Sequence, residues 1–100
     1  MKNISIAETE ILKVIWKNGT STSKEIADEL THCNWSRNTV NTLIKRLCEK
    51  RVLNVIGRNG KSFIYESFVS KEEFQKQKLE ELLSLAFDGK IENLIKFYKK

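Results

Sequence analysis

The chain has 100 residues, and its composition, with 31% charged residues, four glycines and no proline, favours helices over an all-β sandwich or a disordered tail. The net charge is +5, and no apolar run approaches the roughly 20 residues that a membrane span needs. An acidic residue, Glu8, stands where a signal peptide would be apolar, so we expect a cytoplasmic protein.

The first predicted helix begins after Ser5. Ser5 and Glu8 have the spacing of a capping box, in which the serine accepts from a backbone amide of the first turn and the glutamate reaches back to the backbone of the cap. Gly19 stands where a left-handed residue ends a helix. Apolar residues repeat between them at helical spacing, and these predict its buried face: Ala7, Ile11, Leu12, Val14, Ile15 and Trp16.

Two further helices follow. Thr22 and Glu25 form a second capping box, which opens a helix of about ten residues. Ser36 is expected to cap the third helix, with Trp35 packing on Val40 beyond the cap. The third helix has its buried stripe at Val40, Leu43, Ile44 and Leu47.

The sequence then changes to the period of strands. Residues 52–56 and 62–66 are β-rich runs on either side of an Asn59-Gly60 pair, which is a strong hairpin signal. Three helices followed by a basic hairpin are the order of a winged helix-turn-helix. The fold class predicted is therefore mainly α with a small β-hairpin wing.

Positive charge is concentrated in this part of the chain. Residues 36–62 carry seven basic residues against one acid, a net charge of +6, whereas the remainder carries −1. Localised positive charge is typical of proteins that bind nucleic acid, although a merely solvated basic face is the alternative.

The outward face of the third helix is polar, and the second helix of such a motif reads the major groove from its N-terminal end. Asparagine pairs with adenine, arginine with guanine, and the threonine methyl contacts thymine. The candidate base-reading residues are Arg37, Asn38, Asn41 and Thr42. The candidate phosphate contacts are Ser36, Lys45, Arg46, Lys50, Arg58 and Lys61. The alternatives are that the amides are only solvated, that Ser36 is only a cap, and that the hairpin cations only protect a sheet edge.

The last part of the chain predicts two more helices, divided by Asp88-Gly89, the first beginning at a Ser70/Glu73 capping box. We expect a DNA-binding domain at residues 1–69 and a dimerisation segment at residues 70–100. The apolar stripes of this segment would be too large to leave exposed, so we expect a second copy of the chain to cover them. The alternative is that the long helix folds back on its own domain. The candidate dimerisation residues are Leu79, Leu82, Leu83, Ala86, Ile91, Leu94, Ile95 and Tyr98.

Other functions find little support. His32 has no serine nucleophile or carboxylate near it in sequence, and there is no glycine-rich phosphate loop, so we expect no enzyme and no cofactor. Cys33 and Cys48 lack a CxxC spacing and are expected to be reduced thiols. A metal site from these three residues is a poor template, because two ligands are adjacent and one is distant. We therefore predict no metal site.

The run Ser36–Leu47, after Asn34-Trp35, closely resembles the recognition helix of the penicillinase-repressor family. That family comprises the BlaI and MecI repressors and, more distantly, the copper-responsive CopY repressors, whose cysteine pairs this chain lacks. Further matching segments are Ile4–Glu8 with Ile15-Trp16, Ile64–Ser67, and Phe87–Gly89 through Leu94-Ile95.

The resemblance implies a winged-helix homodimer that represses genes for β-lactamase or a resistant penicillin-binding protein. It implies relief of repression through a membrane sensor and cleavage of the repressor, in the segment matching Lys96–Tyr98, where the usual asparagine is missing. It adds Thr39 to the base-reading set, while Asn38 and Asn41 replace basic residues of the antibiotic-responsive members. The chain ends roughly one helix before typical members, from which we expect a smaller dimer interface.

The leading hypothesis is therefore a repressor that binds a palindromic operator in double-stranded DNA as a homodimer, with an upstream protease or sensor as a further partner. The alternative is a winged-helix module for protein–protein assembly, whose basic helix is only solvated. The salt dependence of duplex binding discriminates between them.

Overall fold

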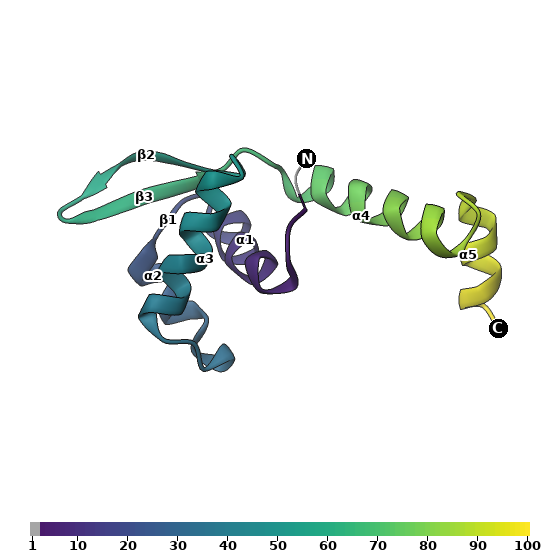
Figure 1. Cartoon of the computed structure of the whole chain (residues 1–100), viewed down its shortest axis with the longest axis horizontal. Helices are drawn as coiled ribbons and strands as arrows, with labels where there is room; N and C mark the ends of the chain where they lie inside the picture. Colours follow the sequence, from purple (N-terminus) through teal and green to yellow (C-terminus); the bar gives the residue numbers. More distant parts are fainter. Residues whose placement is uncertain (1–2) are drawn as a thin grey trace. The chain divides into compact units, whose positions relative to one another are not determined.

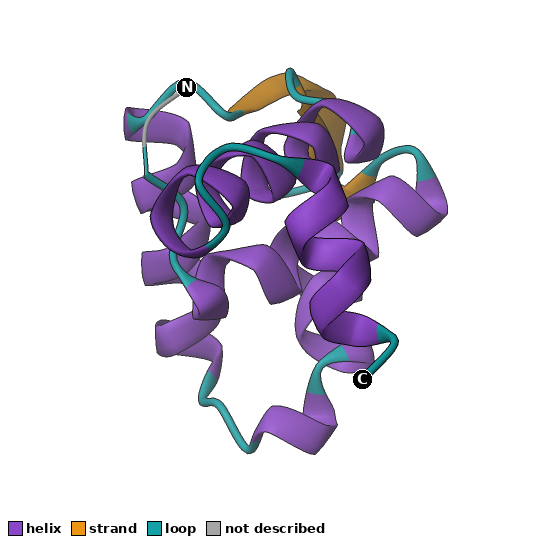
Figure 2. Cartoon of the chain, turned by 90° about the vertical axis from the view of Figure 1, so that its right-hand side faces the viewer, coloured by secondary structure: helices purple, strands orange, loops and turns teal. Residues whose placement is uncertain are grey.

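The structure is a computed structural model that describes residues 3–100. The chain separates between Val69 and Ser70 into two compact units. Helices make up most of it, as Figure 2 shows. None of the helices within residues 3–100 has both the length and the apolar character that crossing a membrane requires.

The first unit has the helices and strands of a winged helix-turn-helix (Figure 1). Its sheet is antiparallel, with strand order β1-β3-β2. The prediction of a mainly α fold with a hairpin wing is confirmed. In chain order, the elements are α1 (Ile6–Asn18), β1 (Ser21–Thr22), α2 (Ser23–Glu29), a short 3-10 turn η1 (Thr31–Cys33), α3 (Arg37–Glu49), β2 (Leu53–Asn59) and β3 (Ser62–Ser67).

The core of this unit lies between α1, α2, α3 and the bases of β2 and β3. The predicted stripe of α3 is buried along its whole length, and most of that of α1 is buried too, while Ala7 and Trp16 are half-buried. The indole nitrogen of Trp16 donates to the carbonyl of Val69 at 2.9 Å, which fixes the end of the unit. The most completely buried apolar side chains are Ile11, Leu12, Ile15, Ile26, Val40, Leu47 and Val52.

The helix starts follow from local hydrogen bonds. In the first capping box the amide of Glu8 donates to Ser5 Oγ at 3.1 Å, and the amide of Ser5 donates to Glu8 Oε1 at 2.8 Å. The box of Thr22 and Glu25 is also complete, and both predictions are confirmed. At Ser70 only the serine half forms, because the carboxylate of Glu73 accepts from the serine hydroxyl at 3.2 Å instead of from the backbone. The prediction of a full capping box there is wrong.

The hairpin of β2 and β3, residues 53–67, is named the wing below. Its turn has Gly60 at φ 64°, a left-handed conformation that glycine adopts without steric cost. The register shifts between Val55 and Gly57, so β2 contains a bulge and extends to Asn59, beyond the predicted end at residue 56.

Two features of the first unit differ from the prediction. The second helix is seven residues long, shorter than expected, because the chain tightens after it into η1. A short strand, β1, precedes α2 and pairs with β3, with Ser21 opposite Tyr65 and Thr22 opposite Ile64. Thr22 therefore ends a strand and caps a helix.

The second unit consists of α4 (Lys71–Ala86) and α5 (Ile91–Tyr98). The chain turns between them at Asp88 and Gly89, which both have positive φ. The side-chain amide of Asn93 donates to the carbonyl of Phe87 at 3.0 Å, and the rings of Phe87 and Phe97 lie 5.8 Å apart. These contacts hold α5 against the end of α4.

Candidate nucleic-acid interface

The N-terminal half of α3 presents an exposed polar face. Its helix is capped by Ser36, whose hydroxyl accepts from the amide of Thr39 at 3.1 Å. The buried stripe holds the opposite face against α1 and α2, so the orientation of the polar face is set by the core. All five predicted base-reading residues are exposed: Arg37, Asn38, Thr39, Asn41 and Thr42.

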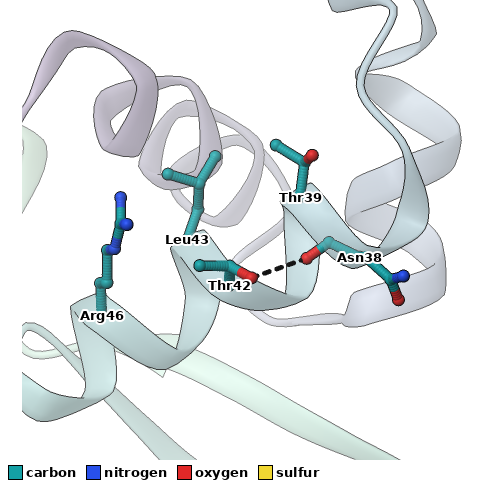
Figure 3. A pocket seen from close by; sticks show the side chains of 5 residues that line it. All are labelled: Asn38, Thr39, Thr42, Leu43 and Arg46. Atoms are coloured by element: carbon teal, nitrogen blue, oxygen red, sulfur yellow. Dashed lines mark hydrogen bonds between the residues drawn. The ribbon is translucent and has the colours of Figure 1, made fainter.

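The surface of α3 is hollowed where its polar face meets the buried stripe. A shallow pocket of about 270 Å³ is lined by Asn38, Thr39, Thr42, Leu43 and Arg46. Figure 3 shows Thr39, Leu43 and Arg46 pointing to one side of the helix, while the amide of Asn38 points away from them. The hollow therefore combines hydroxyl, apolar and cationic groups at the flank of the polar face.

The amide side chains on this face remain available. Thr42 uses its hydroxyl locally, donating to the carbonyl of Asn38 at 2.9 Å. Within residues 3–100 no hydrogen bond engages the side-chain amides of Asn38 or Asn41. Each can therefore offer both a donor and an acceptor to a ligand.

Arg37 is partly committed to the fold. Its guanidinium donates to Ser23 Oγ at 3.0 Å and so ties the start of α3 to the start of α2. Five N–H groups are available on a guanidinium, so this contact leaves others for a ligand. Sequence reasoning did not find Ser23, since its spacing from Arg37 follows no helical or strand period.

The cations predicted to contact phosphate lie on two elements. Lys45 and Arg46 are exposed on α3, and Arg58 and Lys61 are exposed on the wing. The guanidinium of Arg58 lies over the ring of Phe63, 5.1 Å from its centre. Arg58 and Phe63 are cross-strand partners, so counting back from the Asn59-Gly60 turn could have identified this pair.

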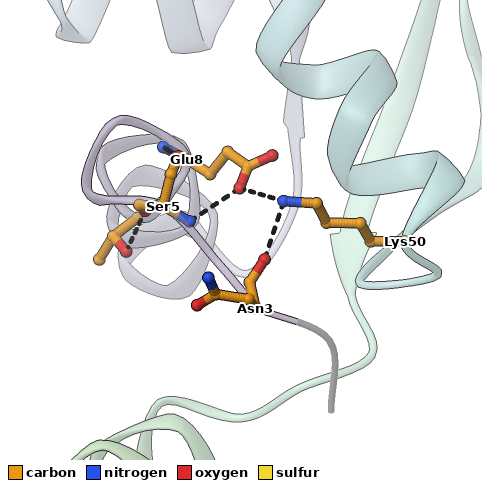
Figure 4. A network of polar contacts seen from close by, with 5 residues as sticks. Asn3, Ser5, Glu8 and Lys50 are labelled. Carbon is orange, nitrogen blue, oxygen red and sulfur yellow. Dashed lines mark hydrogen bonds and ion pairs between the residues drawn. The ribbon is translucent and has the colours of Figure 1, made fainter.

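Lys50, one of the predicted phosphate contacts, makes two contacts within the fold. Its ammonium donates to Glu8 Oε1 at 2.6 Å and to the carbonyl of Asn3 at 2.8 Å, as Figure 4 shows. Its ammonium is therefore engaged by the first turn of α1, and these contacts compete with the predicted contact to phosphate. Burial alone would raise the pKa of Glu8, but the hydrogen bonds from Lys50 and Ser5 outweigh it and hold that pKa below its usual value.

The candidate dimerisation residues lie in the second unit, and most of them are exposed within the single chain. Leu79, Leu82, Ile91 and Ile95 are each about two-fifths exposed, at 39–45%, and Tyr98 is 86% exposed. Ala86 is also exposed, and Leu83 and Leu94 are half-buried. Sequence reasoning left out Phe97, an exposed aromatic residue paired with Phe87.

Comparison with known proteins gives the family. The sequence profile described as "Penicillinase repressor" matches residues 4–99, nearly the whole chain. The chain belongs to the penicillinase repressor family. Among its relatives in this family is the penicillinase repressor of Bacillus licheniformis, which is 30% identical over 93 residues, covering 92% of this chain and 72% of the relative.

Other members of the penicillinase repressor family support the same assignment. The methicillin resistance regulatory protein MecI of Staphylococcus aureus strain N315 is 27% identical over 92% of this chain and 75% of its own length. The solution structure of the DNA-binding domain of the repressor BlaI matches with a TM-score of 0.63 at 35% identity, covering 73% of this chain and 93% of that domain. The first unit thus has the fold of a known DNA-binding domain.

Proposed function

We propose that this chain is a DNA-binding transcriptional repressor that binds a palindromic operator as a homodimer. The observation that carries the proposal is the exposed N-terminal half of α3, where unengaged amides lie beside cations in a chain of the penicillinase repressor family. The groups offered are those of DNA recognition, and the protein acts by binding rather than by catalysis.

In this proposal α3 lies in the major groove with its N-terminal end toward the bases. Asn38 and Asn41 offer paired donors and acceptors to adenine, while Thr39 and Thr42 contribute hydroxyl and methyl groups. The capped N-terminus at Ser36 suits a phosphate. The remaining phosphate contacts come from Lys45, Arg46, Arg58 and Lys61, which fix the register of the protein on the duplex.

The homodimer is supported by the apolar surface of the second unit. Exposed leucines and isoleucines of α4 and α5 form a surface of the kind that monomers rarely leave open. A two-fold related copy covers both surfaces at once. It also supplies a second α3, which a palindromic operator with half-sites about one helical turn apart requires.

The proposal includes a cytoplasmic location and relief of repression by an upstream sensor or protease of the kind that the family resemblance implies. Phe97 and Tyr98 are strongly exposed near the end of α5, so the matching segment is accessible in a single chain. A cut there would remove part of the apolar surface that the dimer needs.

The experiment is selection of bound sites from random duplex DNA, followed by a salt titration of the selected site. Four cations per protomer predict about eight phosphate contacts per dimer, hence a slope of log affinity against log salt near −7. A recovered inverted repeat and a steep slope support the proposal. A failure to bind duplex DNA even at low salt contradicts it and favours a module for protein–protein assembly.

A further inference from the structure

The 3-10 turn that precedes α3 brings three metal-binding side chains together. His32, the only histidine of the chain, and Cys33 lie in η1, and Glu10 lies on α1. One ligand atom from each, an imidazole nitrogen, a thiol sulfur and a carboxylate oxygen, lie within 4.8 Å of one another. In the sequence, the third candidate metal ligand was the distant Cys48. In the fold, Glu10 takes that place.

We propose that Glu10, His32 and Cys33 form a zinc site. Thiolate, imidazole and carboxylate are the donors that Zn²⁺ takes in proteins, whereas Mg²⁺ and Ca²⁺ prefer sites made of oxygen atoms alone. The thiolate and the carboxylate together balance the charge of the ion. Three protein ligands leave the fourth tetrahedral position for water, and the Cys33 thiol releases its proton to solvent when the ion binds.

The three side chains can reach the positions of zinc ligands without a change in the backbone. Ligand atoms around a tetrahedral zinc ion lie roughly 3–4 Å apart, so a small side-chain movement suffices. His32 is exposed, and Glu10 and Cys33 are half-buried, so the site opens to solvent. Glu10 contacts the ammonium of Lys13 at 3.1 Å, and Lys13 is 62% exposed. An exposed ion pair of this kind is weak and does not prevent ligation.

The site would cross-link α1 to the turn that sets the start of α3. The amide of Cys33 donates to the carbonyl of Leu30 at 3.0 Å, and Asn34 follows in a left-handed conformation at φ 56°. A metal ion held by α1 and η1 restrains this connection only in the folded state. Because the ion binds the folded chain, zinc is expected to raise the temperature of thermal unfolding.

The test is a titration of the full chain with Co²⁺ in a phosphine reductant, followed by displacement with Zn²⁺. The expected result is one ion per chain and a thiolate-to-cobalt charge-transfer band in the near ultraviolet. Cys33→Ser should abolish the band, whereas the matched control Cys48→Ser should keep it. Removing a residue that only orients a metal ligand costs about 10–100-fold in metal affinity. Because Glu10 and His32 are proposed as direct ligands, Glu10→Gln and His32→Gln should each weaken zinc binding by more than about tenfold.

Three results would overturn the site. They are the absence of a charge-transfer band in the unsubstituted protein, a band that persists in Cys33→Ser, and a stoichiometry of half an ion per chain, which would place the ligands on two chains. Circular dichroism checks that each variant is folded. The cobalt titration of the unsubstituted protein decides the proposal even if a variant does not fold. None of these readouts depends on DNA binding.

Discussion

The ammonium of Lys50 lies 2.6 Å from Glu8 Oε1 and joins the end of α3 to the first turn of α1. The two partners differ in environment, because the side chain of Glu8 is 2% exposed and that of Lys50 is 29% exposed. The second oxygen, Oε2, is buried without a hydrogen-bond partner among the described residues. Lys50 is therefore the cation that, together with the backbone amide of Ser5, favours the charged form of Glu8.

Lys50→Met should lower the free energy of unfolding by about 2 kcal/mol, because it leaves a buried carboxylate without its cation. Denaturant titration measures this change. DNA affinity of the folded protein should remain nearly unchanged, since the ammonium of Lys50 is engaged within the fold. The matched variant Lys45→Met should do the reverse, sparing stability and reducing the salt dependence of DNA binding. If Lys50→Met instead reduces the salt dependence of DNA affinity and leaves stability unchanged, Lys50 contacts phosphate.

Asn41→Ala should relax the base preference at one position of each half-site and cost about 1–3 kcal/mol for the preferred base pair, because a bidentate contact is removed. Site selection repeated with the variant measures this effect. Lys45→Ala provides the contrast, because the loss of a phosphate contact weakens all sequences alike. An unchanged selected motif for Asn41→Ala would show that Asn41 does not read a base.

Replacing Arg58 and Lys61 of the wing with alanine should lower DNA affinity at least about tenfold and flatten the salt slope, because two cations per protomer leave the phosphate backbone. Folding should be affected little, since the contact of Arg58 with Phe63 is exposed and worth about 0.5–1 kcal/mol. Alanine at both Lys71 and Lys76 of α4 removes the same charge elsewhere and serves as the control. Equal affinities of the two double variants would limit the wing to a structural role.

Leu82→Lys should raise the dimer dissociation constant by roughly a hundredfold or more, because two-fold symmetry places the unpaired charge twice in an apolar interface. Sedimentation over a range of concentrations measures it. Ser84→Lys adds the same charge on the polar side of α4 and should leave the dimer intact. Finding the unsubstituted chain as a monomer at micromolar concentration would contradict the proposed assembly.

The sequence predicts those parts of the fold in which neighbouring residues decide the structure. The stripe of α3 repeats every turn, each complete capping box spans four residues, and the Asn59-Gly60 pair indicates a hairpin turn. What it misses depends on contacts between distant segments. Strand β1 exists only because β3 lies beside it, and Lys50 meets Glu8 across 42 positions of the chain. Glu10 and the η1 turn are likewise brought together by packing, which no local pattern records.

Thr22 belongs to strand β1 and also caps helix α2, and these two roles limit the residues that can replace it. Its backbone pairs with Ile64 in the sheet, its hydroxyl accepts from the amide of Glu25, and its side chain is almost fully buried. Asparagine and aspartate cap helices well but are disfavoured in strands, and valine suits a strand but cannot cap. Serine is the one common substitute that retains the hydroxyl. Among functional variants drawn from a random library, position 22 should therefore be one of the most restricted positions, although Thr22 is not one of the proposed DNA contacts.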